Sequence, residues 1–203
     1  GETEFLVSVL RAACYVVIAC LTGMRDGEIQ ELTRDSITTR DGLAALASTE
    51  HKGNNDMDGE NRAWWAPQPA IRACEVLAAV SPHSTYLFAR SATNAASYNG
   101  DRDIPRLLAF VNGDPATRPG RGNGLALRRI ETTDSDSINA LTLRRSFAVY
   151  ATTKPGAELG LGIQLGHSAW RMTSGYMSDG QQRSVQHLDG VRKGVLREQA
   201  AAL

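Results

Sequence analysis

The sequence lacks the features that identify several large classes of protein. It has no internal repeat, no low-complexity segment and no zinc-type cysteine spacing, and its 3 cysteines are too few and odd in number for a disulfide framework. Lysine is scarce, with 3 residues against 19 arginines, and the formal net charge is zero. These absences exclude a disordered, collagen-like or coiled-coil chain and favour an ordinary globular domain.

The sequence also lacks an uninterrupted apolar run of the length that a membrane span needs. Residues 5–21 are mostly apolar, but Ser8 and Arg11 interrupt them, so this segment predicts a buried helix. Two of the three cysteines lie in it, which suits buried free thiols in a reducing compartment. The chain opens with acidic residues rather than with a secretory signal. We therefore expect a cytoplasmic location and no membrane partner.

The zero net charge conceals an asymmetry along the chain. Residues 1–60 hold 11 acidic and 5 basic residues, whereas residues 61–203 hold 11 acidic and 17 basic ones. A surface that binds nucleic acid needs local positive potential rather than a basic average. Arginine, the dominant base here, grips phosphate oxygens with a planar fork of donors. The composition is therefore compatible with nucleic-acid binding and does not indicate it alone.

Hydrophobic periodicity and turn residues predict a mainly helical α+β domain with one small antiparallel sheet near its start. Helices are expected at residues 4–21, 26–32, 70–80, 104–111, 138–152, 158–165, 168–177 and 182–201, and strands at residues 36–39, 43–49 and 62–66. The polar segment 50–61 is expected to be a mobile loop between two of these strands. A length of 203 residues suits one sizeable domain.

Arg25 is the first candidate for phosphate chemistry. Gly23 is expected to end the first helix, which places Arg25 at the start of the second helix, where free N–H groups and the helix dipole favour an anion. Glu28, three residues further on, is able to orient Arg25. Taken by itself, Arg25 has a simpler explanation as a surface arginine at a helix junction.

A histidine and a tyrosine near the end of the sequence are able to complete such a site. The run Leu165–Ser168 (LGHS) contains His167, and Tyr176 follows nine residues later. A phenol can attack a phosphodiester while cationic side chains stabilise charge on its non-bridging oxygens. Gly175 removes bulk beside that phenol.

Arg144 and Lys52 supply two more cations. Arg144 lies in the predicted helix 138–152, within the segment LTLRRSFA, and Leu141 shares its helix face. Lys52 lies in the polar segment between two predicted strands, whereas the other two lysines lie close to or within predicted helices. A solvated loop lysine is the simpler explanation for Lys52 alone.

Together, and in this order along the chain, these elements resemble the tyrosine recombinases of the phage-integrase family. The segment around Arg25 is similar to the family motif T-G-x-R-x-x-E, and the LGHS run followed by Tyr176 is similar to its L-G-H-S…Y signature. The segment around Arg144 resembles the family's H-x-x-R box, although Leu141 stands where the family has histidine. The resemblance extends from about residue 21 to residue 177.

The resemblance implies an integrase catalytic-domain fold and an activity that breaks and rejoins DNA. In that mechanism Tyr176 forms a 3′-phosphotyrosyl link, Arg25, Arg144 and His167 hold the phosphate, and Lys52 protonates the leaving 5′ oxygen. The reaction uses no metal and no other cofactor. The implied partners are double-stranded DNA and further copies of the protein, which form a tetramer on DNA in the family.

Residues 1–203 are expected to form a single catalytic domain, a fragment that lacks the family's amino-terminal DNA-binding domain. Two alternatives remain open, a DNA-binding relative without catalysis and an enzyme similar to type IB topoisomerases. Leu141 bears on the first alternative, because leucine can neither donate nor accept a proton. A covalent protein–DNA adduct distinguishes an enzyme from the non-catalytic relative, and dependence on two defined sites distinguishes a recombinase from a topoisomerase.

Overall fold

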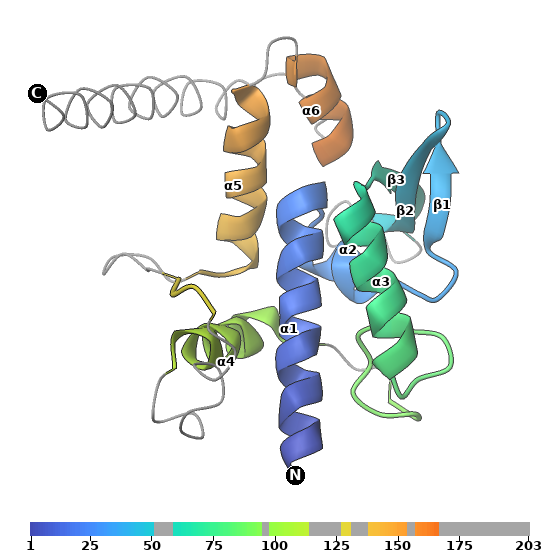
Figure 1. Cartoon of the computed structure of the whole chain (residues 1–203). Helices are drawn as coiled ribbons and strands as arrows, with labels where there is room; N and C mark the ends of the chain where they lie inside the picture. Colours follow the sequence, from blue (N-terminus) through green and yellow to red (C-terminus); the bar gives the residue numbers. More distant parts are fainter. Residues whose placement is uncertain (51–58, 95–97, 114–126, 131–137, 154–156, 167–203) are drawn as a thin grey trace, which may run out of the picture. The chain divides into compact units, whose positions relative to one another are not determined.

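A computed structural model shows the architecture of the chain and describes residues 1–50, 59–94, 98–113, 127–130, 138–153 and 157–166 (Figure 1). The chain divides into two compact units, residues 1–144 and residues 145–203, and each is described by itself. The two helices predicted at residues 168–177 and 182–201 lie outside the described residues.

The described residues form a mainly helical structure with one three-stranded antiparallel sheet, which confirms the predicted fold class. The elements are α1 (Glu2–Thr22), α2 (Asp26–Gln30), β1 (Ile37–Arg40), β2 (Leu43–Glu50), β3 (Glu60–Trp65), α3 (Gln68–Val80), α4 (Gly100–Asn112), α5 (Ala140–Thr152) and α6 (Ala157–Leu165). Each corresponds to a predicted element. α2 ends at Gln30, two residues before the end of the helix predicted at residues 26–32.

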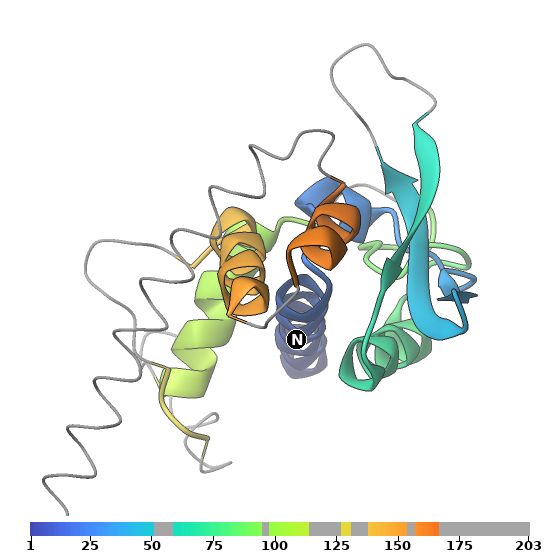
Figure 2. The ribbon, with the colours of Figure 1, turned by 90° about the horizontal axis from the view of Figure 1, so that it is seen from above.

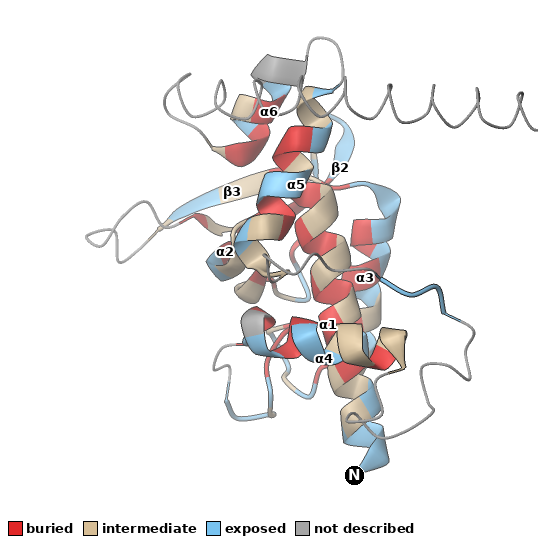
Figure 3. Ribbon diagram, turned by 90° about the vertical axis from the view of Figure 1, so that its left-hand side faces the viewer, coloured by how far each residue is buried: buried red, intermediate tan, exposed pale blue. Residues whose placement is uncertain are grey.

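α1 is the central helix of the first unit. It lies between α3 and α4, and the sheet lies on the α3 side (Figures 1 and 2). Tyr15 and Ile18 of α1 are fully buried, while exposed residues gather towards its N-terminal end (Figure 3). By length and composition alone α1 could cross a membrane, but here it packs along much of its length against the other helices of this unit.

The sheet has the order β1-β2-β3, and its turns follow from local sequence. Asp41 and Gly42 join β1 to β2 with φ angles of 52° and 76°, the left-handed conformations that a two-residue type I′ hairpin turn requires. The predicted loop over residues 50–61 was too long at both ends, because Glu50 is the last residue of β2 and pairs with Glu60, the first residue of β3. A carboxylate is able to occupy the buried end of β2 because two arginines neutralise it, as described below.

The second unit, within its described residues, has a small apolar core. Ala148 of α5 and Leu161 and Leu165 of α6 are buried, and Phe147 and Ala151 pack against them. α6 ends at Leu165, and Gly166 after it has a left-handed φ of 68°, which glycine adopts at little cost at the end of a helix. α5 itself crosses the division between the units, and its residues up to Arg144 belong to the first.

Candidate functional site

The loop between α1 and α2 is shaped by the residues that precede Arg25. The Thr22 hydroxyl donates to the carbonyl of Ile18 at 2.7 Å and accepts from the backbone N–H of Met24 at 3.2 Å. Gly23 then ends α1 with a φ of 68°, a conformation that costs glycine little. Because Met24 is buried, the chain is anchored on both sides of the turn, and Arg25, the residue just before α2, has a defined position.

Two buried carboxylates hold the side chain of Arg25. Its Nη1 donates to Glu28 Oε1 at 2.6 Å and to Glu50 Oε1 at 2.9 Å. Burial alone lowers the pKa of Arg25, but the hydrogen bonds to Glu50 and Glu28, together with their negative charges, outweigh it and raise that pKa above its ordinary value. Arg25 therefore keeps its charge while 39% of its side chain stays exposed.

Glu28 has more contacts than its predicted role in orienting Arg25 required. Its Oε2 also accepts from the backbone N–H of Arg25 at 2.5 Å, and its backbone carbonyl accepts from the Ser48 hydroxyl of β2 at 2.6 Å. The carboxylate therefore caps the backbone N–H of Arg25, the residue just before α2, and a five-residue helix has only a small dipole. The start of this helix therefore contributes little to attracting an anion, and the positive potential comes from the arginine side chains.

Arg144 approaches the same loop from α5. Its Nη1 donates to the carbonyl oxygen of Gly23 and lies 3.9 Å from Glu28 Oε2. Only 8% of the Arg144 side chain is exposed, so this cation is almost fully enclosed. Glu28 thus lies between two guanidinium groups that come from distant parts of the sequence.

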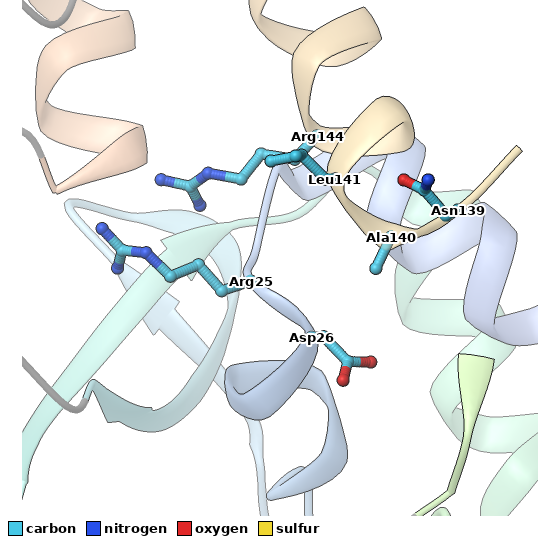
Figure 4. Close-up of a pocket in the computed structure, with 6 residues that line it drawn as sticks. All are labelled: Arg25, Asp26, Asn139, Ala140, Leu141 and Arg144. Atoms are coloured by element: carbon cyan, nitrogen blue, oxygen red, sulfur yellow. The ribbon is translucent and has the colours of Figure 1, made fainter. Parts of the chain in front are cut away.

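The two arginines border one pocket of the first unit. Its volume is about 440 Å³, which lies within the range of about 300–1,000 Å³ that is usual for ligand sites. Both guanidinium groups extend toward the same side (Figure 4). The residues that line the pocket are Arg25, Asp26, Asn139, Ala140, Leu141 and Arg144.

Asp26 brings a negative charge to the pocket wall. Its two carboxylate oxygens accept hydrogen bonds, one from the Tyr15 hydroxyl at 2.5 Å and the other from the Gln30 amide at 2.5 Å. Figure 4 shows this carboxylate pointing away from the guanidinium group of Arg25. The arginine side of the pocket therefore remains the side suited to an anion such as a phosphate, which paired guanidinium groups can bind through several hydrogen bonds.

Leu141 lies at the start of α5 beside Arg144, and 71% of it is exposed. Its helix spacing predicted that position 141 would face the same site as Arg144, and both residues do line the pocket. An exposed leucine contributes apolar surface there and no donor or acceptor. The structure thus brings together Arg25, Glu28, Arg144 and Leu141, whereas Lys52, His167 and Tyr176 lie outside the described residues.

Two residues near this site were not predicted from the sequence, Glu50 and Asp26. Glu50 was assigned to a polar loop, although Leu46, Ser48 and Glu50 alternate along one buried face of β2. That alternation was the available signal, and the polar sequence after Glu50 obscured it. Among the described residues, no group of three or more His, Cys, Asp or Glu side chains is placed to hold a metal ion.

The architecture is that of the catalytic domain of tyrosine recombinases. Over 92% of its length the chain matches the XerA recombinase with a TM-score of 0.55 and 17% sequence identity. Over 92% it matches the XerH site-specific recombinase in a post-cleavage complex with palindromic difH substrate, with a TM-score of 0.57 and 20% identity. Over 93% it matches the Tn1549 transposon integrase in complex with transposon right end DNA, with a TM-score of 0.55 and 15% identity.

The chain spans less than two thirds of each of these proteins, namely 62% of the XerA chain, 50% of the XerH chain and 64% of the Tn1549 integrase chain. No protein-family model matches the sequence. No curated protein matches it in sequence either. At these identities the likeness establishes the fold, and the chemistry has to be argued from the site.

Proposed function

We propose that this chain is the catalytic domain of a site-specific recombinase or integrase, which breaks and rejoins double-stranded DNA through a 3′-phosphotyrosyl link at Tyr176. The observation that carries the proposal is the convergence of Arg25 and Arg144 on one pocket, with Glu28 between them. Two guanidinium groups aimed at the same space suit the oxygens of a phosphodiester.

The proposed chemistry assigns one task to each residue. Arg25, Arg144 and His167 hold the phosphate and stabilise the charge that develops on its oxygens. Tyr176 attacks the phosphorus, and Lys52 protonates the 5′ oxygen that leaves. A 5′ hydroxyl of a second strand then attacks the phosphotyrosine and releases the enzyme, so the energy of the broken bond is kept without a nucleotide or metal cofactor.

The fold neighbours support DNA as the partner, because the XerH and Tn1549 structures contain DNA substrates. We propose that this domain acts in a longer, cytoplasmic protein whose amino-terminal domain completes the grip on DNA, and that several copies assemble on the DNA. The affinity of this chain alone for DNA is then expected to be weak and to fall steeply as the salt concentration rises, because the binding depends on contacts with phosphates.

A second candidate is a relative that binds DNA without cutting it. Leu141 favours this candidate, because it places apolar surface in the pocket where the family pattern has a histidine. The enzyme remains the stronger candidate, since the loss of one proton-transfer group usually slows a reaction without abolishing it.

Covalent trapping on DNA tests the proposal. The chain, and the longer protein expected to contain it, are incubated with a library of nicked duplexes randomised around the nick, and adducts are resolved on a denaturing gel. Wild type is expected to form adducts, while Tyr176→Phe forms none and retains its affinity for duplex. Tyr150→Phe, which alters an exposed tyrosine of α5, is the matched control and should still form adducts. Salt-sensitive binding by wild type without any adduct would instead support the non-catalytic relative.

A further inference from the structure

Glu50 is a buried acid whose two carboxylate oxygens each contact a different arginine. Oε1 accepts from Arg25 Nη1 at 2.9 Å and Oε2 accepts from Arg62 Nη1 at 3.0 Å. Only 2% of the Glu50 side chain is exposed. An isolated carboxylate at such a place would be costly, and the contacts with these two arginines lower that cost.

The other end of this contact chain is anchored in the hydrophobic core. Arg62 lies opposite Ser48 on β3, which puts it diagonally across from Glu50. The Arg62 guanidinium lies 4.8 Å from the centroid of the Trp64 ring, and Trp64 is fully buried. The contacts therefore run from a rigid tryptophan through Arg62 and Glu50 to Arg25.

The contacts of Arg25 are confined to one edge of its guanidinium group. Within the described residues its side-chain hydrogen bonds run through Nη1, which Glu28 and Glu50 share. This arrangement leaves Nε and Nη2 for an anion in the pocket. Glu28 alone would allow the planar group to pivot about a single contact, whereas two carboxylates from different elements restrict its orientation.

We propose that Glu50 is a positioning residue that presents the Nε and Nη2 donors of Arg25 to the scissile phosphate, an inference that rests on the proposed function. Glu50 does not touch the phosphate and acts through Arg25. Its negative charge also lowers the positive potential of the pocket. Removing that charge should therefore preserve or tighten DNA binding while the reaction slows, because the arginine loses its orientation.

Glu50→Gln tests this separation of binding from rate. The amide keeps the size of the side chain, but its NH₂ group faces one of the two arginines and cannot accept a hydrogen bond from it. We expect the rate of adduct formation to fall on the order of ten- to a hundredfold, as a misplaced catalytic contact does. The dissociation constant for duplex is expected to stay within about threefold of wild type or to decrease. Glu75→Gln, which breaks the exposed Arg72–Glu75 pair, is the matched control and should behave as wild type.

Two further variants separate positioning from a purely structural role in the sheet. Arg62→Gln leaves the Glu50–Arg25 contact in place, so its rate should fall less than that of Glu50→Gln. In a double-mutant cycle, Glu50→Gln should add little to the loss caused by Arg25→Lys, because both changes act on the same guanidinium position. Equal losses for Arg62→Gln and Glu50→Gln, or additive losses in the cycle, would overturn the proposal.

The NMR signal of the Arg25 Nε–H group gives a readout that does not depend on catalysis. In wild type we expect a resolved signal that shifts when a short duplex is added. In Glu50→Gln we expect this signal to be broadened. The unfolding midpoint of each protein is measured as well, to show that the variant is folded. An unchanged Arg25 signal in Glu50→Gln would overturn the positioning role. If wild type forms no adduct at all, the proposed activity fails, and this signal still decides whether Glu50 orients Arg25.

Discussion

The arginine pocket and the core between α1 and α3 both bury ionisable groups, but they treat charge in opposite ways. At the pocket, the buried acids Glu28 and Glu50 lie against Arg25, which lines it, and the pKa of Arg25 is raised. In the core, burial raises the pKa of the Cys14 thiol to about 11. Burial, with smaller contributions from Cys14 and Glu75, raises the pKa of the Cys74 thiol to about 12.

This difference shows that burial alone does not determine whether a group is charged. Partners of opposite charge keep Arg25 charged, whereas the thiols, whose pKa values are shifted chiefly by burial, remain neutral at physiological pH. The pocket is thus a charged, hydrogen-bonded region set into a neutral core. Substitutions that remove a charged partner at the pocket should have large effects on adduct formation and on stability. Substitution of a buried core cysteine should change the pH dependence of stability mainly at alkaline pH.

The largest effect is expected from removing Arg144. In Arg144→Gln the Gly23 carbonyl loses its donor and Glu28 loses one of two nearby cations, in a place with little access for water. We expect adduct formation to be abolished and the free energy of unfolding to fall by about 3 kcal/mol. Arg25→Gln should abolish adducts with a smaller loss of stability, because Arg25 is partly exposed and water can replace its donors.

Urea denaturation and adduct trapping on both variants check this ordering. Arg72→Gln, at an exposed pair, serves as the control and should change neither quantity. If Arg25→Gln proved as destabilising as Arg144→Gln, the two arginines would be equivalent structural ions and the distinction between an enclosed and an accessible cation would be wrong.

Much of the fold could be predicted because it follows from local signals. The apolar periodicity of α1, the glycines at positions 23 and 166, and the Asp41-Gly42 turn each specify a boundary through short-range sterics. The end of β2 was missed, because the polar sequence after Glu50 obscured the alternation of Leu46 and Ser48 with it, and the arginines that contact Glu50 reach it only in the tertiary structure. Local polarity indicated a loop, and long-range charge pairing outweighed it.

For the candidate site, the sequence predicted which of the described residues lie close together. Arg25, Glu28 and Arg144 were identified from motif spacing, and the structure brings them together. Motif spacing does not indicate which groups neutralise them, so the contact of Glu50 with Arg25 and the presence of Asp26 in the pocket wall emerged only from three-dimensional packing. The roles of all the predicted site residues stay predictions, those of Arg25, Glu28 and Arg144 as much as those of Lys52, His167 and Tyr176.

A smaller effect is expected from giving the pocket the donor that it lacks. Leu141→His places an imidazole beside Arg144 on an exposed helix position, where substitution costs little stability. One added donor at a developing charge is worth on the order of a hundredfold in rate, so adducts should form faster on nicked duplex.

Leu141→Ala is the control for Leu141→His, because it removes the same apolar surface without adding a donor. It should leave the rate close to that of wild type. A histidine variant that is no faster than wild type would indicate that position 141 does not face the reacting phosphate. Leu141 would then be better explained as a feature of a domain that binds DNA without cutting it.

The last effect concerns the neutral core, is absent at neutral pH and appears only at high pH. The folded pKa of Cys74 is about 12 against an ordinary value of 9.0, so the folded state holds this proton more tightly than the unfolded state. The resulting stabilisation is fully present below about pH 9 and is lost as the pH rises toward the folded pKa, for a total on the order of a few kcal/mol.

Unfolding free energies measured in urea between pH 8 and about pH 11 should therefore fall more steeply for wild type than for Cys74→Ala, after the constant cost of the smaller side chain is subtracted. Other groups also lower stability at high pH, Tyr98 among them because burial raises its pKa, but they do so in both proteins, so the difference between the two curves isolates the thiol. Parallel curves would mean that Cys74 ionises as readily in the folded protein as in the unfolded one, and that the core tolerates a charge that only the arginine pocket is built to hold.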